Sequence, residues 1–157
     1  MKIDNLDLEI IKHLQNDARL SFRELGRKLN IPHTTIFTRA ERLVKRGVIK
    51  KFSAVLHPHD LGLKISMLFI HSNPSESKRI AKEIAQHPEV RKVFRTVDGK
   101  IIVKAVVPDD AHGGLENFLA KLDAYEFDVY PIHEVSKFES DIPSDILKTV
   151  DFYRDRK

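Results

Sequence analysis

Two helix signals separated by a very short turn, between Ser21 and Gly47, constrain this chain more than any other feature. Ser21 followed three positions later by Glu24 forms a capping box, which predicts that a helix begins at Ser21. Asn30 suits the left-handed end of that helix. An apolar stripe then predicts a second helix that ends at Gly47, and its members are Ile36, Ala40, Leu43 and Val44. Two helices joined in this way are typical of a helix-turn-helix.

A further helix is predicted ahead of this pair, over residues 5–17. Acidic residues stand in its first turn, where they favour a helix start. Its apolar positions recur at helical spacing, and they are Leu6, Ile10, Ile11 and Leu14. The first third of the chain is therefore expected to be a small three-helix unit.

The last helix of this unit turns a polar face outward. Threonines at its N-terminal end suit base edges and phosphates, and Arg39 can fork onto a guanine or a phosphate. The run Val48–Leu56 alternates enough to predict a wing-like strand that brings lysines to the DNA backbone. The predicted DNA-contacting residues are Ser21, His33, Thr34, Thr35, Thr38, Arg39, Arg42, Lys45, Lys50 and Lys51.

The charge of the chain is distributed unevenly. Residues 1–60 hold twelve Lys and Arg against seven Asp and Glu, a net +5, whereas residues 61–157 hold fifteen against sixteen, a net −1. A basic first part indicates a polyanionic partner. The alternative is that its polar face is merely a solvated surface, but the capped helix and the short turn favour double-stranded DNA.

The second part of the chain predicts a different architecture. Strands are expected over residues 64–72, 90–97, 100–107 and 127–138, with helices over residues 75–88 and 109–123. Asp109 or Asp110 is expected to cap the second helix, and Pro131 to confine the last strand to an edge or a bulge. This order is the ferredoxin-like βαββαβ arrangement, so the fold class is α+β.

A four-stranded sheet with helices on one face leaves its other face bare. That bare face favours a homodimer formed sheet to sheet. RNA binding would instead require exposed aromatic side chains on the sheet, where only Phe94 and Phe127 are expected. The alternative function is a ferredoxin-like small-molecule sensor or enzyme whose basic part binds RNA or an acidic protein.

Several motifs resemble the Lrp/AsnC (feast/famine) transcription regulators. The matching residues are Leu6-Asp7, the stretch "LQNDAR", the run of Arg39, Arg42, Leu43, Gly47, Val48, Ile49 and Lys50, and the closing "LHP…LG". The resemblance implies a winged helix-turn-helix, a hinge strand, and a ferredoxin-like (RAM, ACT-like) domain that binds an effector and forms dimers or larger rings such as octamers. The predicted domains are residues 1–48, the linker 49–62, residues 63–140 and a helical tail over 141–157.

One departure from the family lies in the DNA-binding half. The family usually begins its recognition helix with a serine cap, whereas Pro32 stands at that position here. Proline is tolerated in the first helical turn, so His33 or Thr34 is expected to supply the capping interactions.

A second departure lies at Asp98-Gly99, between two apolar runs. This dipeptide predicts a two-residue type I′ hairpin. Members of that family have a sequence similar to Gly-Asp-Tyr-Asp in this loop, and they hold an amino-acid effector there. The resemblance therefore implies an effector site at Thr96, Asp98, Gly99 and Lys100. This chain lacks the downstream aspartate and has a lysine instead. The loop is therefore expected either to bind nothing or to accept a different, more acidic ligand.

Catalysis and metal binding find little support in the sequence. There is no cysteine, no glycine-rich phosphate loop and no nucleophile-elbow pattern, and no cofactor is expected. His57, His59 and Asp60 could hold a metal, but a surface turn is the favoured interpretation. No apolar run is long enough to span a membrane, and without cysteines a cytoplasmic location is the default.

Overall fold

The computed structural model describes residues 3–109, 113–137 and 142–149. Contacts divide the chain into two compact units. The first, here called the DNA-binding unit, holds residues 1–55 together with 139–157, and the second, the ferredoxin-like unit, holds residues 56–138.

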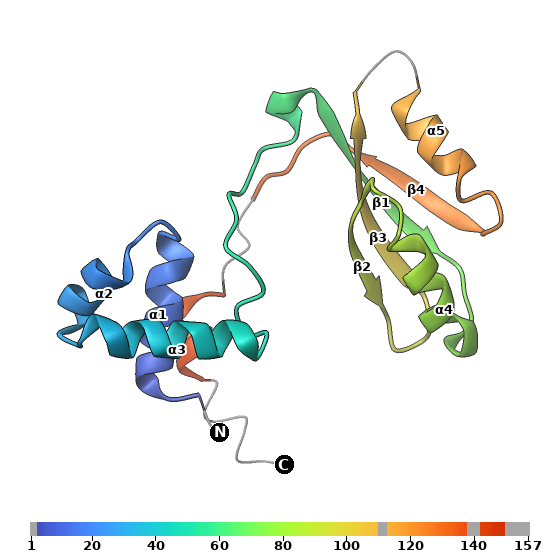
Figure 1. The fold of residues 1–157 in the computed structure, drawn as a ribbon. Helices are drawn as coiled ribbons and strands as arrows, with labels where there is room; N and C mark the ends of the chain where they lie inside the picture. Colours follow the sequence, from blue (N-terminus) through green and yellow to red (C-terminus); the bar gives the residue numbers. More distant parts are fainter. Residues whose placement is uncertain (1–2, 110–112, 138–141, 150–157) are drawn as a thin grey trace. The chain divides into compact units, whose positions relative to one another are not determined.

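Three helices make up most of the DNA-binding unit: α1 (Asn5–Asn16), α2 (Phe22–Leu29) and α3 (His33–Lys45) (Figure 1). A short helix, α6 (Ser144–Lys148), belongs to the same unit. The three main helices enclose one apolar core, built from Ile10, Leu14, Leu25, Ile36, Ala40 and Leu43. Burying a Leu or Ile side chain contributes roughly 1.5–3 kcal/mol, so this core is the main source of the unit's stability.

The predicted helix ends are confirmed. Ser21 and Glu24 form a complete capping box, and Asn30 adopts the left-handed conformation at φ 55°. Gly47 follows α3 at φ 67°, and the amides of Gly47 and Val48 donate to the carbonyls of Val44 and Leu43 in a Schellman motif. These ends were predictable because each depends on residues within one turn of the helix.

Two expectations for this unit are wrong. Val44 is 37% exposed rather than buried, because it lies eight residues after Ile36 and is therefore turned about 80° from Ile36 around the helix axis. The run Val48–Leu56 forms no strand, because no other segment among the described residues pairs with it. A strand requires a hydrogen-bonded neighbour, which alternating apolar residues alone do not provide.

The ferredoxin-like unit begins with a short 3₁₀ turn, η1 (His59–Leu61), and contains a four-stranded antiparallel sheet. The predicted order is confirmed. Its elements are β1 (Leu63–Ile70), α4 (Pro74–Ile84), β2 (Val90–Arg95), β3 (Ile101–Pro108), α5 (Gly114–Ala120) and β4 (Phe127–Ile132). The spatial order β2-β3-β1-β4 leaves β4 at an edge, where Pro131 is tolerated as expected.

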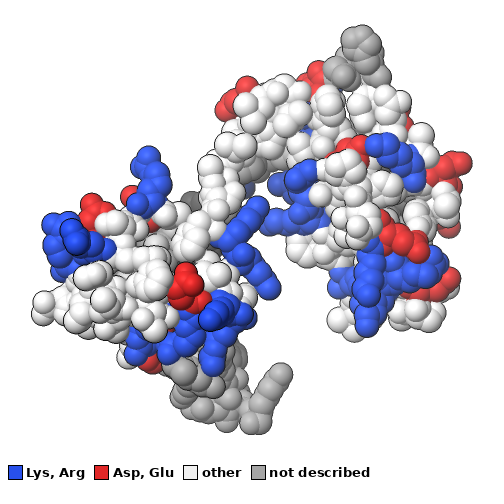
Figure 2. All heavy atoms as spheres, in the orientation of Figure 1, with Lys and Arg blue, Asp and Glu red and all other residues white. Residues whose placement is uncertain are grey.

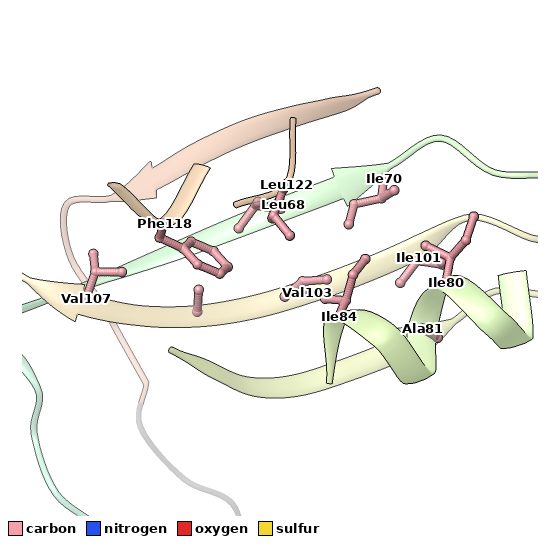
Figure 3. Packing of buried hydrophobic residues seen from close by; sticks show 11 residues of the cluster. Leu68, Ile70, Ile80, Ala81, Ile84, Ile101, Val103, Val107, Phe118 and Leu122 are labelled. Carbon is pink, nitrogen blue, oxygen red and sulfur yellow. The ribbon is translucent and has the colours of Figure 1, made fainter. Parts of the chain in front are cut away.

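Both helices of this unit cover the same face of the sheet (Figure 1). Figure 3 shows the apolar side chains of β1 and β3 pointing toward α4 and toward Phe118 and Leu122. Alternate residues of β3 are fully buried against the helices, and they are Ile101, Val103, Ala105 and Val107. This core fixes the β2–β3 hairpin and the start of α4 against each other.

The expected cap of α5 is wrong. The helix begins at Gly114, with Gly113 in the left-handed conformation before it and no side-chain cap. Asp109 instead lies beside Lys64, with 2.5 Å between Oδ1 and Nζ. Asp110 lies outside the described residues.

Candidate nucleic-acid interface and effector loop

The outward face of α3 carries small polar side chains at its N-terminal end. His33, Thr34, Thr35 and Thr38 are exposed there, and Lys45 is exposed one to two turns further on. The Thr38 hydroxyl donates to the Thr34 carbonyl at 2.9 Å. Base edges and phosphates bind donors and acceptors of the kind that this face offers, which are the His33 imidazole, the Thr34 and Thr35 hydroxyls and the Lys45 ammonium.

No side chain caps the N-terminus of α3. Pro32 stands at the N-cap and makes no side-chain hydrogen bond, so the expectation that His33 or Thr34 supplies the cap is wrong. The first amides of a helix have no partner within the helix. Uncapped amides at the positive end of the helix dipole are well suited to a phosphate oxygen.

A hollow of about 480 Å³ lies beside this helix start, between α2 and the turn into α3. Arg23 and Arg27 of α2 line it together with His33. Neither arginine was predicted as a functional residue, because the hollow exists only once the turn has folded. The one available signal was their basic charge, four residues apart on α2.

Gly26 allows the turn that forms this hollow. Its carbonyl accepts a hydrogen bond from the Ile31 amide at 2.9 Å. A Cβ at position 26 would lie 2.6 Å from the Ile31 carbonyl oxygen, which is closer than real Cβ contacts allow. Only glycine therefore permits α2 and α3 to approach this closely.

Arg39 and Arg42 do not lie with the threonines. Arg39 Nη1 donates to both carboxylate oxygens of Asp4, at 2.6 and 2.5 Å, and to Asp7 Oδ1 at 3.0 Å. Arg42 Nη2 donates to Asp7 at 2.9 and 3.1 Å. The Asp7 side chain is only 2% exposed, whereas those of Arg39 and Arg42 are 23% and 27% exposed.

These four side chains form an acid–arginine cluster between α1 and α3. Asp4 and Asp7 also form the capping box of α1, so the start of α1 and the middle of α3 are fixed together. The hydrogen bond from Arg39 holds the pKa of Asp4 below its ordinary value, and the same contact raises the pKa of Arg39. The expected outward placement of Arg39 and Arg42 is therefore wrong, and their contact with DNA stays a prediction.

The other residues predicted to contact DNA are Ser21, Lys50 and Lys51, and they lie outside α3. The hydroxyl of Ser21 donates to Glu24 at 2.6 Å within the capping box, and this hydrogen bond lowers the pKa of Glu24. Lys50 and Lys51 are exposed, but they follow α3 in a segment without regular structure. Figure 2 shows Lys and Arg side chains in several groups on the DNA-binding unit, with Asp and Glu side chains beside some of them.

The predicted effector loop is a three-residue hairpin turn rather than a type I′ turn. Asp98 has no positive φ, and only Gly99 is left-handed, at φ 91°. The Gly99 amide donates to the Thr96 carbonyl at 3.2 Å, and the Thr96 amide donates to the Lys100 carbonyl at 2.9 Å. This pattern fits a type I turn followed by a left-handed glycine.

Gly99 also packs directly on the start of α4. A Cβ there would lie 2.5 Å from the Pro74 nitrogen, and the Gly99 carbonyl accepts a hydrogen bond from the Ser72 hydroxyl at 2.6 Å. The Thr96 hydroxyl donates to Asp98, and this bond lowers the pKa of Asp98. The turn is thus held by its own side chains and by its neighbour.

A pocket of about 490 Å³ lies next to this turn, lined by residues that include Asp98, Lys100 and Arg79. Several of its charged groups have partners of opposite sign, whereas no ion pair of Glu126, which also lines it, is found among the described residues. Lys100 Nζ lies 3.5 Å from Asp98 Oδ2, and Arg79 donates to Glu83 at 2.8 Å. Tyr125 also donates to Glu83 at 2.6 Å, so the pKa of Tyr125 is raised and that of Glu83 is lowered.

The His57–Asp60 stretch forms a local contact. His57 Nδ1 lies 3.3 Å from Asp60 Oδ2, and the rings of His57 and His59 are 5.8 Å apart. Among the residues that the structure describes, no three His, Cys, Asp or Glu side chains gather as a metal site would require. In the same part of the chain, no helix has the length and apolar character needed to cross a bilayer.

Three helices with an uncapped, threonine-rich third helix, followed by a ferredoxin-like sheet, define a helix-turn-helix regulator. Residues 3–50 match a family model described as winged helix-turn-helix DNA-binding. PH0061 of Pyrococcus horikoshii, an uncharacterized HTH-type transcriptional regulator, is 33% identical over 144 residues, which cover 88% of this chain and 97% of PH0061. The chain belongs to the Lrp/AsnC family of transcriptional regulators.

Solved structures agree with this assignment. The crystal structure of PH0061 superposes with a TM-score of 0.80 at 31% identity, covering 89% of this chain and 99% of that one. LrpC of Bacillus subtilis gives a TM-score of 0.72 at 26% identity, covering 87% of this chain and 99% of LrpC. A second P. horikoshii regulator, PH0140, is 37% identical over 91 residues, and that alignment spans 57% of this chain and 58% of the length of PH0140.

Proposed function

We propose that the chain is a transcription regulator that binds double-stranded DNA with α3 in the major groove. The uncapped start of α3, flanked by Arg23 and Arg27, is the observation that carries this proposal. In this arrangement the helix amides and the two arginines hold one phosphate, which fixes the register of α3 on the duplex. Thr34, Thr35 and His33 then meet base edges.

Arg39 and Arg42 play a different part in this proposal. Their guanidiniums are committed to Asp4 and Asp7, so they hold α3 at a fixed angle on α1. Specificity comes from side chains at the N-terminal end of α3, and the cluster sets where those side chains lie. Lys45, Lys50 and Lys51 add phosphate contacts that do not depend on sequence.

The bare face of the sheet supports a homodimer. Phe69, Phe94 and Tyr130 are exposed on this face, and the rings of Phe69 and Tyr130 pack edge to face at 5.4 Å. Exposed aromatic groups of this kind are typical of a surface that a partner covers. Two DNA-binding units in a dimer would read a pseudo-palindrome, with half-sites about one helical turn apart. Larger oligomers, such as octamers, are assemblies of such dimers.

The same face of the sheet is also the surface on which the alternative function, RNA binding, would depend. The expectation that the only sheet aromatics are Phe94 and Phe127 is wrong, since Phe127 packs on the helix side while Phe69 and Tyr130 face outward. Exposed aromatics on a ferredoxin-like sheet can stack bases of single-stranded RNA. Phe69→Glu separates the two possibilities. Dimer dissociation in light scattering, with the fully exposed Val97→Glu as control, supports the dimer, and loss of RNA binding by an unchanged dimer supports the alternative.

An effector is a separate part of the proposal. One structural neighbour, NMB0573 of Neisseria meningitidis, was solved as an L-Met complex, but it is only 19% identical. In this chain Lys100 Nζ lies 3.5 Å from Asp98 Oδ2, so the carboxylate of the turn already faces a cation where a ligand's amino group would have to bind. We propose that neutral amino acids do not bind here in the manner implied for the family. Micromolar binding in calorimetric titration, abolished by Asp98→Ala, would refute this.

The activity is thus regulatory rather than catalytic, and the location is the cytoplasm. Anisotropy of a labelled duplex measured against salt tests the DNA-binding proposal. Affinity should fall steeply with salt, and Arg27→Ala and Lys45→Ala should each reduce the slope of log K against log[salt] by about 0.9. Lys82→Ala, an exposed lysine of the ferredoxin-like unit, is the matched control. Absent or salt-insensitive duplex binding would contradict the proposal.

A further inference from the structure

The C-terminal segment, defined here as residues 142–149, belongs to the DNA-binding unit although it follows the ferredoxin-like unit in sequence. Within this segment α6 packs on α1. The DNA-binding unit is therefore assembled from two stretches of chain, and the ferredoxin-like unit is connected to it at both of its ends. The apolar core of the three helices, given above, contains no residue of this second stretch.

The side chain of Gln15 in α1 forms hydrogen bonds with the main chain at the start of the segment, at Ile142. The side-chain amide donates from Nε2 to the Ile142 carbonyl at 3.1 Å, and the Ile142 amide donates to Oε1 at 2.9 Å. A side-chain amide that makes both bonds to one residue mimics a neighbouring β-strand. This contact fixes the register of the segment without depending on which side chain stands at position 142.

Leu147 provides the apolar half of the contact. It is 6% exposed, whereas its neighbour Ile146 on the same short helix is 58% exposed. Leu147 and Ile142 line a groove of about 490 Å³ whose other walls come from α1 and from the stretch after α3. These walls are mainly apolar, but they also include Gln15, Lys50, Lys51 and Ser53. The groove wall includes Ile11 and Ile49, which also pack against the core of the three helices.

We propose that the C-terminal segment, held against α1 at Gln15 and Leu147, acts as a strap on the DNA-binding unit. Docking at Gln15 and Leu147 adds a second connection between the two units, besides the one at residues 55–56. Two connections restrict the rotation of one unit relative to the other far more than a single flexible linker does. The strap therefore limits which half-site spacings a dimer accepts, a consequence that rests on the proposed DNA binding.

Hydrogen exchange in the full chain tests the docking without DNA. The Ile142 amide should exchange at least about tenfold more slowly than an unstructured amide, and Gln15→Ala should abolish this protection. Gln86→Ala is the matched control, because the Gln86 side chain, just after α4, donates only to the Lys82 carbonyl among the contacts described. Unprotected exchange at Ile142 in the wild type would overturn the proposal.

Thermal unfolding tests the apolar half. Leu147→Ala should lower the melting temperature of the DNA-binding unit by about 5–15 °C, and Ile146→Ala on the exposed side should lower it by less than about 3 °C. Equal effects of the two variants would overturn the proposal. So would Ile142 protection that appears only in a dimer, because that result would place the segment on a second copy instead.

Half-site spacing tests the consequence for DNA. The measured quantity is the affinity for an operator whose half-sites are moved by two or three base pairs, divided by the affinity for the optimal spacing. In the double variant Gln15→Ala, Leu147→Ala this ratio should be at least about fivefold higher than in the wild type. Unchanged spacing preference in a variant whose Ile142 has lost protection would overturn the strap role while leaving DNA binding intact. Loss of all duplex binding would instead count against the proposed function.

Discussion

Neutralising Asp7 is expected to destabilise the DNA-binding unit more than any surface charge change would. Its carboxylate is 2% exposed and accepts hydrogen bonds from Arg39 and Arg42. Removing one member of a buried ion pair typically costs about 3–5 kcal/mol, because the remaining charges lose their partner. The two guanidiniums are each about one-quarter exposed and can still reach water, so Asp7→Asn should cost about 3 kcal/mol.

Chemical and thermal unfolding followed by circular dichroism measure this loss. A decrease of about 3 kcal/mol corresponds to a drop of roughly 15 °C in the melting temperature of a small unit. Glu9→Gln is the matched control on the same helix, since Glu9 and Lys12 form an exposed pair at 3.8 Å worth less than about 1 kcal/mol. Equal effects of Asp7→Asn and Glu9→Gln would refute the structural role of the cluster.

Three further outcomes follow from the structure. Gly99→Ala should cost about 2 kcal/mol or more in thermal unfolding, because φ is positive and the Cβ would strike Pro74; a neutral result would contradict the packed turn. Val44→Ala should cost less than about 1 kcal/mol and Leu43→Ala about 3 kcal/mol by the same assay, in line with their exposure. Acid titration followed by circular dichroism should show a loss of stability as the pH falls below about 3.8, the ordinary pKa of Asp4. This follows because a lowered folded pKa gives stability that is present above that value and lost below it. Asp4→Asn should remove part of this acid dependence, and an unchanged profile would contradict the assignment.

Local signals in the sequence were sufficient for the elements and their ends. The Ser21–Glu24 capping box, the left-handed Asn30 and the glycine after α3 each depend on atoms within one helical turn, so their residues alone predict them. The βαββαβ order was likewise predictable, because alternation and helical spacing report which side of each element is buried. Pro131 at an edge strand follows from its missing amide.

Contacts between distant residues were not predictable in this way. Arg39 lies 35 residues from Asp4, and only the packing of α3 on α1 shows that the arginine faces a carboxylate rather than solvent. The Asp98-Gly99 turn is longer by one residue than predicted, because Thr96 pairs with Lys100. The run after α3 alternates like a strand but has no partner in the described chain.

The hollow beside α3 shows the same limit. Arg23 and Arg27 become candidate phosphate ligands only because Gly26 lets the turn close against α2. The docking of Leu147 and Gln15 also joins residues separated by most of the chain. Such pairings depend on the tertiary fold, which one sequence does not reveal without a resemblance to guide it.

Selection of bound duplexes from a random pool tests the central claim most directly. A two-fold symmetric consensus is expected, with half-sites about one helical turn apart, and Thr35→Ala should change the preferred base at one position of each half-site. Thr96→Ala, in the hairpin turn of the ferredoxin-like unit, should leave the base preference unchanged. Enrichment of no sequence, or of a single asymmetric site that Thr35→Ala does not alter, would contradict sequence-specific binding through α3.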